Sequence, residues 1–203
     1  MGTPPPWKLL NAGQLRPKKA LGQNFLIDPS TAQLIIRKSG VTAQDAVVEI
    51  GPGLGALTFA LAGAARVVYA IEKDAALVRI LDEQLRRNEV LNVRLTHGDI
   101  FDADLAAIAL REASPLMVFG NLPYYISSQL LIYLVRLRTC IRQADLMFQK
   151  EVARRLTAVP GTKAYSRLTV MLQYYADISR TAAVDAHLFW PKPGVDSEVL
   201  QFR

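Results

Sequence analysis

The stretch "VVEIGPGLGALT", residues 47–58, decides the fold class. It begins as a short apolar strand, turns through glycines at positions 51, 53 and 55, and continues as a helical pattern to about residue 62. Glycine lets the backbone turn sharply and lie close to a ligand where a helix begins. The loop has the pattern G-x-G-x-G before Ala56, and so departs from the G-x-G-x-x-G loop of dinucleotide-binding folds. The stretch predicts half of a βαβ unit, and its loop is either a nucleotide-binding turn or a tight structural one.

Strands and helices alternate on both sides of this stretch. Strands are predicted over 46–50, 66–71, 92–96, 115–120 and 144–149, and helices over 28–38, 74–88 and 164–175 among others. This alternation predicts right-handed crossovers and a mostly parallel sheet that helices cover on both faces. The last two segments, 177–184 and 196–202, have strand patterns with a long loop and no helix between them. They predict an antiparallel edge strand in an α/β fold.

Composition limits the possible classes of protein. The chain has 203 residues, of which 51% are hydrophobic, so it can bury the core of one ordinary domain. No apolar run reaches the roughly 18 residues that a membrane helix needs. One cysteine, Cys140, and two histidines leave few ligands for a metal site, and we expect none. The single cysteine also favours a reducing compartment, and we expect a cytoplasmic, monomeric protein.

Charge and proline content describe the ends of the chain. The net charge of +6 favours a polyanionic partner, with basic residues gathered in residues 1–27 and again in 136–167. Either set could also be an ordinary solvated surface. We expect residues 1–15, which begin "MGTPPPW", to be a flexible leader, and residues 16–203 to be one domain. The acid-free start could be an organelle transit peptide, but it lacks serine and an amphipathic pattern.

Acidic residues follow two of the predicted strands, at the sheet edge where ligands of open α/β folds bind. Glu72 comes 21 residues after Gly51, a spacing at which an acid can accept both hydroxyls of a ribose. Asp99 follows the next strand and can accept a hydrogen bond from an adenine amine. Each acid alone could be a surface carboxylate or a turn cap. Together with the glycine loop they predict a nucleoside pocket, which suits a nicotinamide dinucleotide or S-adenosylmethionine.

The stretch "FGNLPYYIS", residues 119–127, distinguishes these ligands. Methylation of the exocyclic N6 of adenine requires acceptors that hold the amine. The Asn121 side chain and the Leu122 main-chain carbonyl can supply them, while Pro123 fixes the turn. Tyr124 offers a ring on which a base taken out of its helix can stack. The alternative is a strand end with aromatic core packing. We interpret the stretch as a site for methyl transfer, which mainly requires positioning of the amine.

With this motif, the chain resembles the ribosomal RNA adenine dimethyltransferase family over about residues 17–203. The resemblance depends on "LGQNFLID" (21–28), "VVEIGPGLGALT" (47–58), "IEKD" (71–74), "GDIF" (98–101), "FGNLPYYIS" (119–127), "FQKEVARRL" (148–156) and "FWPKPGVDSEV" (189–199). It implies a Rossmann-like class I S-adenosylmethionine-dependent methyltransferase with a seven-stranded, mostly parallel sheet and an antiparallel edge strand. It also implies that members continue into a small helical domain.

The resemblance also implies roles for individual residues. Those expected at the cofactor are Asn24 and Leu26 at its methionine part, Gly51 beside it, Glu72 at the ribose, Asp99 at the adenine, and Asn121 between cofactor and target amine. Tyr124 is expected to stack on the target base with Phe189 of the last loop as its partner. Tyr125 stands where the family usually has a polar residue, and we expect it outside the stack. The basic residue of the last loop, Lys192, does not stand where the family usually has it. This departure bears on the RNA contact expected of the loop and leaves the expectation of methyl transfer unchanged.

The implied activity is N6,N6-dimethylation of two adjacent adenines near the 3′ end of 16S ribosomal RNA, in the 30S subunit or its precursor. The "QKEV" and "KAYSRLTVMLQYY" stretches resemble the KsgA-like small-subunit branch more than the Erm branch, which modifies one adenine of 23S RNA. A ribosome-assembly or transcription factor on the same fold is an alternative of another class. A nicotinamide-dependent oxidoreductase is a further alternative.

Overall fold

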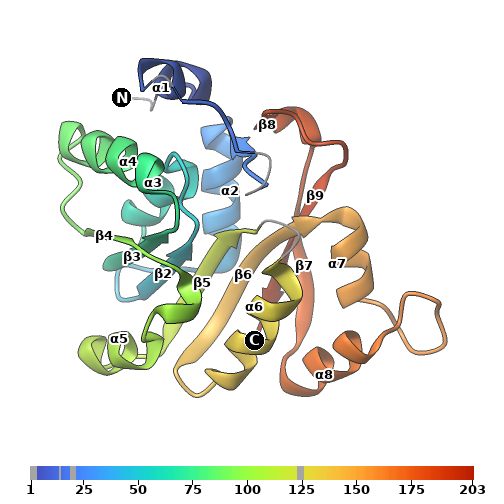
Figure 1. Ribbon diagram of the computed structural model, residues 1–203. Helices are drawn as coiled ribbons and strands as arrows, with labels where there is room; N and C mark the ends of the chain where they lie inside the picture. The colour runs from blue at the N-terminus through green and yellow to red at the C-terminus, as the bar shows by residue number, and fades with distance from the viewer. Residues whose placement is uncertain (1–3, 14, 19–21, 123–125) are drawn as a thin grey trace.

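A computed structural model describes residues 4–13, 15–18, 22–122 and 126–203 (Figure 1). The strands are β1 (Phe25–Leu26), β2 (Ala46–Ile50), β3 (Val67–Glu72), β4 (Val93–His97), β5 (Leu116–Asn121), β6 (Ile141–Gln149), β7 (Ile178–Val184), β8 (Phe189–Trp190) and β9 (Ser197–Phe202). The α-helices are α1 (Pro6–Ala12), α2 (Pro29–Ser39), α3 (Ala56–Ala62), α4 (Ala75–Arg87), α5 (Leu105–Glu112), α6 (Ser127–Arg136), α7 (Lys150–Leu156) and α8 (Arg167–Tyr175). These elements confirm the predicted alternation of strands and helices.

The central sheet has, over the described residues, seven strands in the order β4-β3-β2-β5-β6-β9-β7. The first five strands in this order, from β4 through β3, β2 and β5 to β6, are parallel. Strand β9 is antiparallel to both of its neighbours, β6 and β7. The mostly parallel α/β sheet is confirmed, but the antiparallel strand lies one place inside the edge. Strand β9 is buried along nearly its whole length and needs two neighbours, whereas β7 has the partly exposed pattern of an edge strand.

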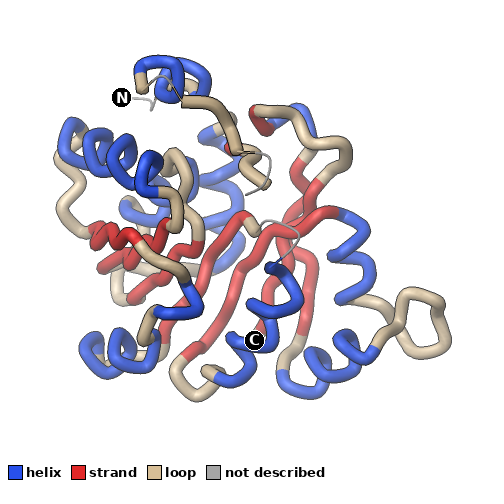
Figure 2. Tube along the Cα trace, viewed as in Figure 1, coloured by secondary structure: helices blue, strands red, loops and turns tan. Residues whose placement is uncertain are grey.

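Helices cover both faces of this sheet, as Figure 2 shows. Helices α2 and α3 pack on one face, where their apolar residues meet Val47, Met117 and Phe119 of the strands. Helices α5, α6 and α8 pack on the other face, around Val48 and Val118. Because both faces are buried, the central strands β2, β3 and β5 are nearly continuous apolar runs. None of the helices described here is both long and apolar enough to span a membrane.

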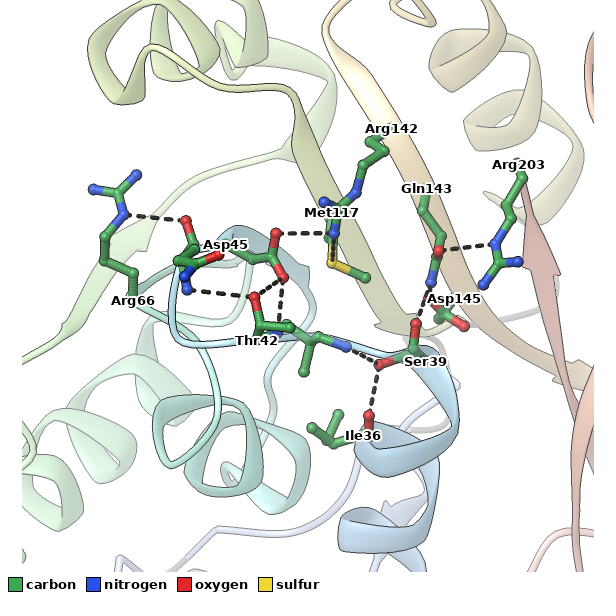
Figure 3. Close-up of polar contacts among 12 residues, drawn as sticks. Ile36, Ser39, Thr42, Asp45, Arg66, Met117, Arg142, Gln143, Asp145 and Arg203 are labelled. Atoms are coloured by element: carbon green, nitrogen blue, oxygen red, sulfur yellow. Dashed lines mark hydrogen bonds and ion pairs between the residues drawn. The ribbon is translucent and has the colours of Figure 1, made fainter.

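Buried polar contacts join the C-terminal end of α2 to strands β6 and β9 of the sheet (Figure 3). The Gln143 amide donates to the main-chain oxygen of Ser39 at 2.8 Å and to Asp145 at 2.6 Å. The Arg203 guanidinium donates to the Gln143 side-chain oxygen at 3.1 Å. Burial raises the pKa of the Asp145 carboxyl, and the bonds from Gln143 and Gln201 partly offset this. The network fixes the C-terminal end of α2 against β6 and β9.

The N-terminal segment differs from the flexible leader predicted for residues 1–15. Residues 6–12 form helix α1, which begins at a proline and buries Leu9 and Leu10. These leucines pack with Phe25, Leu54 and Leu77 in a small apolar cluster of their own. The sequence did not predict this helix because the prolines before it suggested an unstructured tail. Proline is, however, compatible with the first turn of a helix.

Candidate active site

A cavity of about 650 Å³ lies at the carboxyl ends of β2, β3 and β5. Parallel strands place their carboxyl ends at one edge of the sheet, which brings residues far apart in sequence together there. The cavity is lined by seven of the predicted site residues: Asn24, Leu26, Gly51, Glu72, Asp99, Asn121 and Leu122. Residues of the N-terminal segment, including Pro6 and Leu9, line it as well. Pro123, Tyr124 and Tyr125 lie outside the described residues.

The loop from Gly51 to Gly55 forms the floor of the cavity between β2 and α3. Gly55 has φ +90°, and a Cβ there would lie 2.6 Å from the Leu81 side chain on α4. Gly53 has φ +60° and donates its backbone N–H to the Glu72 carboxylate at 3.0 Å. A larger residue at either position would therefore strain the turn, and at position 55 the side chains of Leu81 and Phe59 would also have to shift. The glycines let the loop pack closely against its neighbours, which leaves space for a ligand at the carboxyl ends of the strands.

Glu72 organises the neighbouring strand end. Its carboxylate accepts the Gly53 N–H and, through its other oxygen, the Asp74 N–H at 2.8 Å. The side chain is 7% exposed. Burial raises the pKa of Glu72, and the two backbone hydrogen bonds work against that rise. A carboxylate held in this way at the cavity wall can accept hydrogen bonds from a diol such as a ribose.

Asp99 lies at the end of β4 and forms an ion pair with Lys73. The Lys73 Nζ is 2.7 Å from Asp99 Oδ2, and the Phe101 N–H donates to Asp99 Oδ1 at 3.1 Å. The hydrogen bond from Lys73 is the main reason that the pKa of Asp99 is lowered. Ile100 and Phe101 add apolar surface to the same part of the cavity. A carboxylate beside apolar side chains is suited to a planar base that carries an amine.

Asn121 and Asn24 form a direct contact in the part of the cavity next to the end of β5. The Asn121 Nδ2 donates to the main-chain oxygen of Asn24 at 3.1 Å, which orients the amide. Leu122 is 5% exposed, and its N–H donates to the Met147 carbonyl at 3.3 Å. The predicted pair of acceptors, the Asn121 amide and the Leu122 carbonyl, therefore lies on a segment anchored to two other elements.

Phe189 lies close to this segment but within the core. It is 3% exposed, and its strand β8 pairs with β1 so that Phe189 faces Leu26 in register. It lines a second cavity, of about 20 Å³, together with Asn24, Asn121 and Leu122 among others. Its role as a stacking partner for a base stays a prediction, and that role requires the ring to become accessible.

Three residues beside the cavity, Asp74, Lys18 and Gln23, make contacts with one another that the sequence did not indicate. Asp74, the first residue of the helix predicted over 74–88, caps α4 by accepting the Ala76 N–H at 3.1 Å. It also forms an ion pair with Lys18 at 2.9 Å and accepts a hydrogen bond from Gln23 at 3.0 Å. These contacts attach the N-terminal segment beside Glu72. Gln23 and Asp74 are 51 residues apart in the sequence, so motif spacing did not predict these contacts.

The same fold occurs in solved structures of methyltransferases. An S-adenosylmethionine-dependent methyltransferase from Aquifex aeolicus superposes with a TM-score of 0.54 at 15% identity. The superposition covers 88% of this chain and 91% of the Aquifex chain. At that identity the likeness shows the fold alone. The fold is that of the class I S-adenosylmethionine-dependent methyltransferases, and the cavity lies at the sheet edge where open α/β sheets bind ligands.

The sequence profile described as "Ribosomal RNA adenine dimethylase" matches residues 14–203. The chain belongs to this family. A "Ribosomal RNA small subunit methyltransferase A" from Desulforapulum autotrophicum is 48% identical over 97% of this chain, and another so named from Geobacillus thermodenitrificans is 43% identical over 91%. The chain spans 68% and 63% of the lengths of these two relatives.

Two solved structures are also similar in sequence. A dimethyladenosine transferase from Plasmodium falciparum has a TM-score of 0.77 at 30% identity, and covers 88% of this chain and 62% of its own. The 23S rRNA methyltransferase ErmE has a TM-score of 0.76 at 32% identity, and covers 88% of this chain and 69% of its own. The fold is therefore shared by a protein named for adenosine dimethylation and by one named for methylation of 23S rRNA.

Proposed function

We propose that this chain catalyses S-adenosylmethionine-dependent N6,N6-dimethylation of two adjacent adenines near the 3′ end of 16S ribosomal RNA. The substrate is the 30S subunit or its precursor, and the protein acts in the cytoplasm as a monomer. The observation that carries the proposal is the contact between Asn121 and Asn24, because it joins the residue expected at the amine to the segment expected at the cofactor. The relatives named as small-subunit methyltransferases support the choice of RNA.

The residues present fit the cofactor. Glu72 would hold the ribose and Asp99 the adenine amine, while Asn24, Leu26 and Gly51 would border the methionine part. When bound, S-adenosylmethionine supplies an electrophilic methyl group on sulfur. The cavity volume of about 650 Å³ lies within the usual range for ligand sites.

The chain's own residues position the target amine. The Asn121 side-chain oxygen and the Leu122 carbonyl would accept hydrogen bonds from the two N–H groups of the adenine amine, which holds the nitrogen lone pair toward the methyl group. No strong base is required, because the amine loses its proton readily after it has gained a methyl group. Catalysis then consists mainly of alignment for an in-line displacement. Tyr124 would hold the base by stacking.

The test is transfer of radiolabelled methyl groups to purified 30S and 50S particles, followed by mapping of the modified base. Dimethylated adenines in 16S RNA are expected. Label found on 50S particles alone would favour the Erm-type activity, which the likeness to ErmE raises as the second candidate. Binding to 30S particles without label would instead favour a non-catalytic assembly factor. Calorimetry with S-adenosylmethionine and with NAD separates the oxidoreductase alternative.

A further inference from the structure

The two tryptophans of the chain, Trp7 on α1 and Trp190 on β8, contact each other although they are far apart in the sequence. Their ring centroids are 6.3 Å apart, and the ring planes form an angle of 63°. The Trp190 side chain packs against the small apolar cluster that contains Leu9 and Phe25, so it is held in place from below. Trp7 lies outside this cluster and is 40% exposed. The contact therefore holds a large aromatic ring at the surface.

The tryptophan pair lies beside the place expected for the target base. Successive side chains of a strand point to opposite faces, and in β8 Phe189 packs in the main core while Trp190 packs toward α1. Phe189 lines the small second cavity together with Asn121, whereas neither tryptophan lines that cavity or the cofactor cavity. Figure 1 shows α1 and β8 at the end of the molecule toward which β5 points. An RNA strand that places a base at Asn121 continues on both sides of that base, and the tryptophan pair borders one of these directions.

The surface around Trp7 has an excess of positive charge. Residues 1–27 contain no acid, and the loop of residues 186–195 contains none either. Three exposed cations of these two segments have no acid partner among the described residues. They are Lys8, Arg16 and Lys192. Cations without acid partners are available to the phosphates of an RNA strand.

An exposed aromatic ring among such cations is the arrangement with which proteins hold single-stranded nucleic acids, because bases stack on the ring and phosphates meet the cations. Packing of α1 does not require this ring, since Leu9 and Leu10 already fill the buried side of the helix. Trp190 and the ring of Trp7 are instead arranged as a support and an exposed surface.

We propose that Trp7, supported by Trp190, is a stacking platform for a nucleotide that flanks the target adenine in single-stranded RNA. The base of this nucleotide stacks on the exposed Trp7 ring, while Lys8 and Lys192 contact neighbouring phosphates. This inference rests on the proposed function, since it takes the ribosomal RNA of that reaction as the ligand. Trp7 is thus a binding residue that selects an unpaired segment around the target, because a base stacked within a helix has no free face for the ring.

The tryptophan fluorescence of the whole chain measures this contact, because both tryptophans of the chain belong to the pair. The ligand is a synthetic RNA with the sequence of the 3′ end of 16S ribosomal RNA, and its binding should quench the emission. Abasic nucleotides are then placed one at a time on either side of the target adenines. One of these positions should lose most of the quenching and weaken the affinity about five- to a hundredfold. Quenching that no abasic position reduces would overturn the inference.

Substitutions of Trp7 separate stacking from packing. Trp7→Leu keeps an apolar side chain but offers no ring, and should weaken RNA binding by the same factor, measured by anisotropy of labelled RNA; Trp7→Phe should restore most of it. In Trp7→Leu the abasic RNA should bind as the intact RNA does, since the two changes remove one contact. Turnover of Trp7→Leu should show a raised KM for RNA with kcat unchanged. Tyr174→Leu removes a ring that is 80% exposed on α8, far from α1 in Figure 1, and should match the wild type.

Salt dependence separates stacking from charge. Lys8→Gln should make the slope of log affinity against log salt shallower by about 0.7, whereas Trp7→Leu should leave the slope unchanged. Unchanged affinity of Trp7→Leu for S-adenosylmethionine in calorimetry shows that the variant is folded. Equal RNA affinity of Trp7→Leu and the wild type overturns this inference and leaves the proposed function standing. A wild-type chain that binds S-adenosylmethionine but no RNA overturns both.

Discussion

Replacing Glu72 with alanine removes a carboxylate that holds two backbone N–H groups, those of Gly53 and Asp74, at 3.0 and 2.8 Å. Each donor left without a partner costs about 1–3 kcal/mol. Water from the cavity can replace part of this loss, and the variant no longer buries a charge. We therefore expect a net loss of about 2 kcal/mol in the free energy of unfolding, which lowers the Tm of a domain this size by about 4–8 °C.

The same substitution should weaken S-adenosylmethionine binding at least about tenfold, or 1.4 kcal/mol, because the ribose hydroxyls lose a charged acceptor. Thermal unfolding followed by circular dichroism measures the first effect and calorimetry the second. Glu83→Ala is the matched control, since Glu83 is exposed on α4 in an (i, i+4) pair with Arg87 and should change neither quantity appreciably. A Glu72→Ala protein with wild-type Tm and wild-type affinity would refute the reasoning on both counts.

Three other substitutions address separate parts of the molecule. Asn121→Ala should lower turnover on 30S particles by about a hundredfold or more with a modest loss of cofactor affinity, as for a positioned polar group; steady-state kinetics that retain a tenth of the activity would contradict this. Asp74→Ala should cost about 2 kcal/mol in denaturant unfolding, through the lost cap of α4 and two lost side-chain partners, whereas Asp82→Ala on the exposed face should cost less than about 0.5. Because burial raises the pKa of Glu49 to about 8, its proton favours the folded state, so wild-type stability should fall as pH rises from about 5 to 8; an equally steep fall in Glu49→Gln would disprove this.

Local chemistry made much of the fold predictable. The β2 strand was predicted at its observed bounds, because an apolar run ends at glycines that terminate it. Helix α2 begins and ends as predicted within a residue, since Asp28 caps its first turn and Gly40 with φ +75° stops it. The acids at the strand ends were predictable because parallel strands bring their carboxyl ends to one edge of the sheet.

Contacts between distant segments were not predictable from spacing. The attachment of Lys18 and Gln23 to Asp74 depends on how the N-terminal segment crosses the sheet edge, which no local pattern encodes. The place of β9 inside the sheet edge depends on which strand is buried on both faces, a property of the assembled layers. Glu49 did carry a signal, an acid in the apolar run "AVVEI", but its cavity became apparent only once α2, α3 and the glycine loop were placed.

The position of β9 has a consequence for folding during synthesis. Strand β7 joins the sheet through β9, which is made later and lies between β7 and β6. A nascent chain that has emerged only as far as residue 190 can assemble β2 to β6 with their helices, but β7 then has no neighbour with which to pair. This edge has to close through pairings that are distant in sequence, such as Met147 with Val199, and such pairings form slowly. While it waits, β7 presents unpaired backbone groups to other nascent chains, so the interval before residues 197–202 emerge is the period in which misassembly is most favoured.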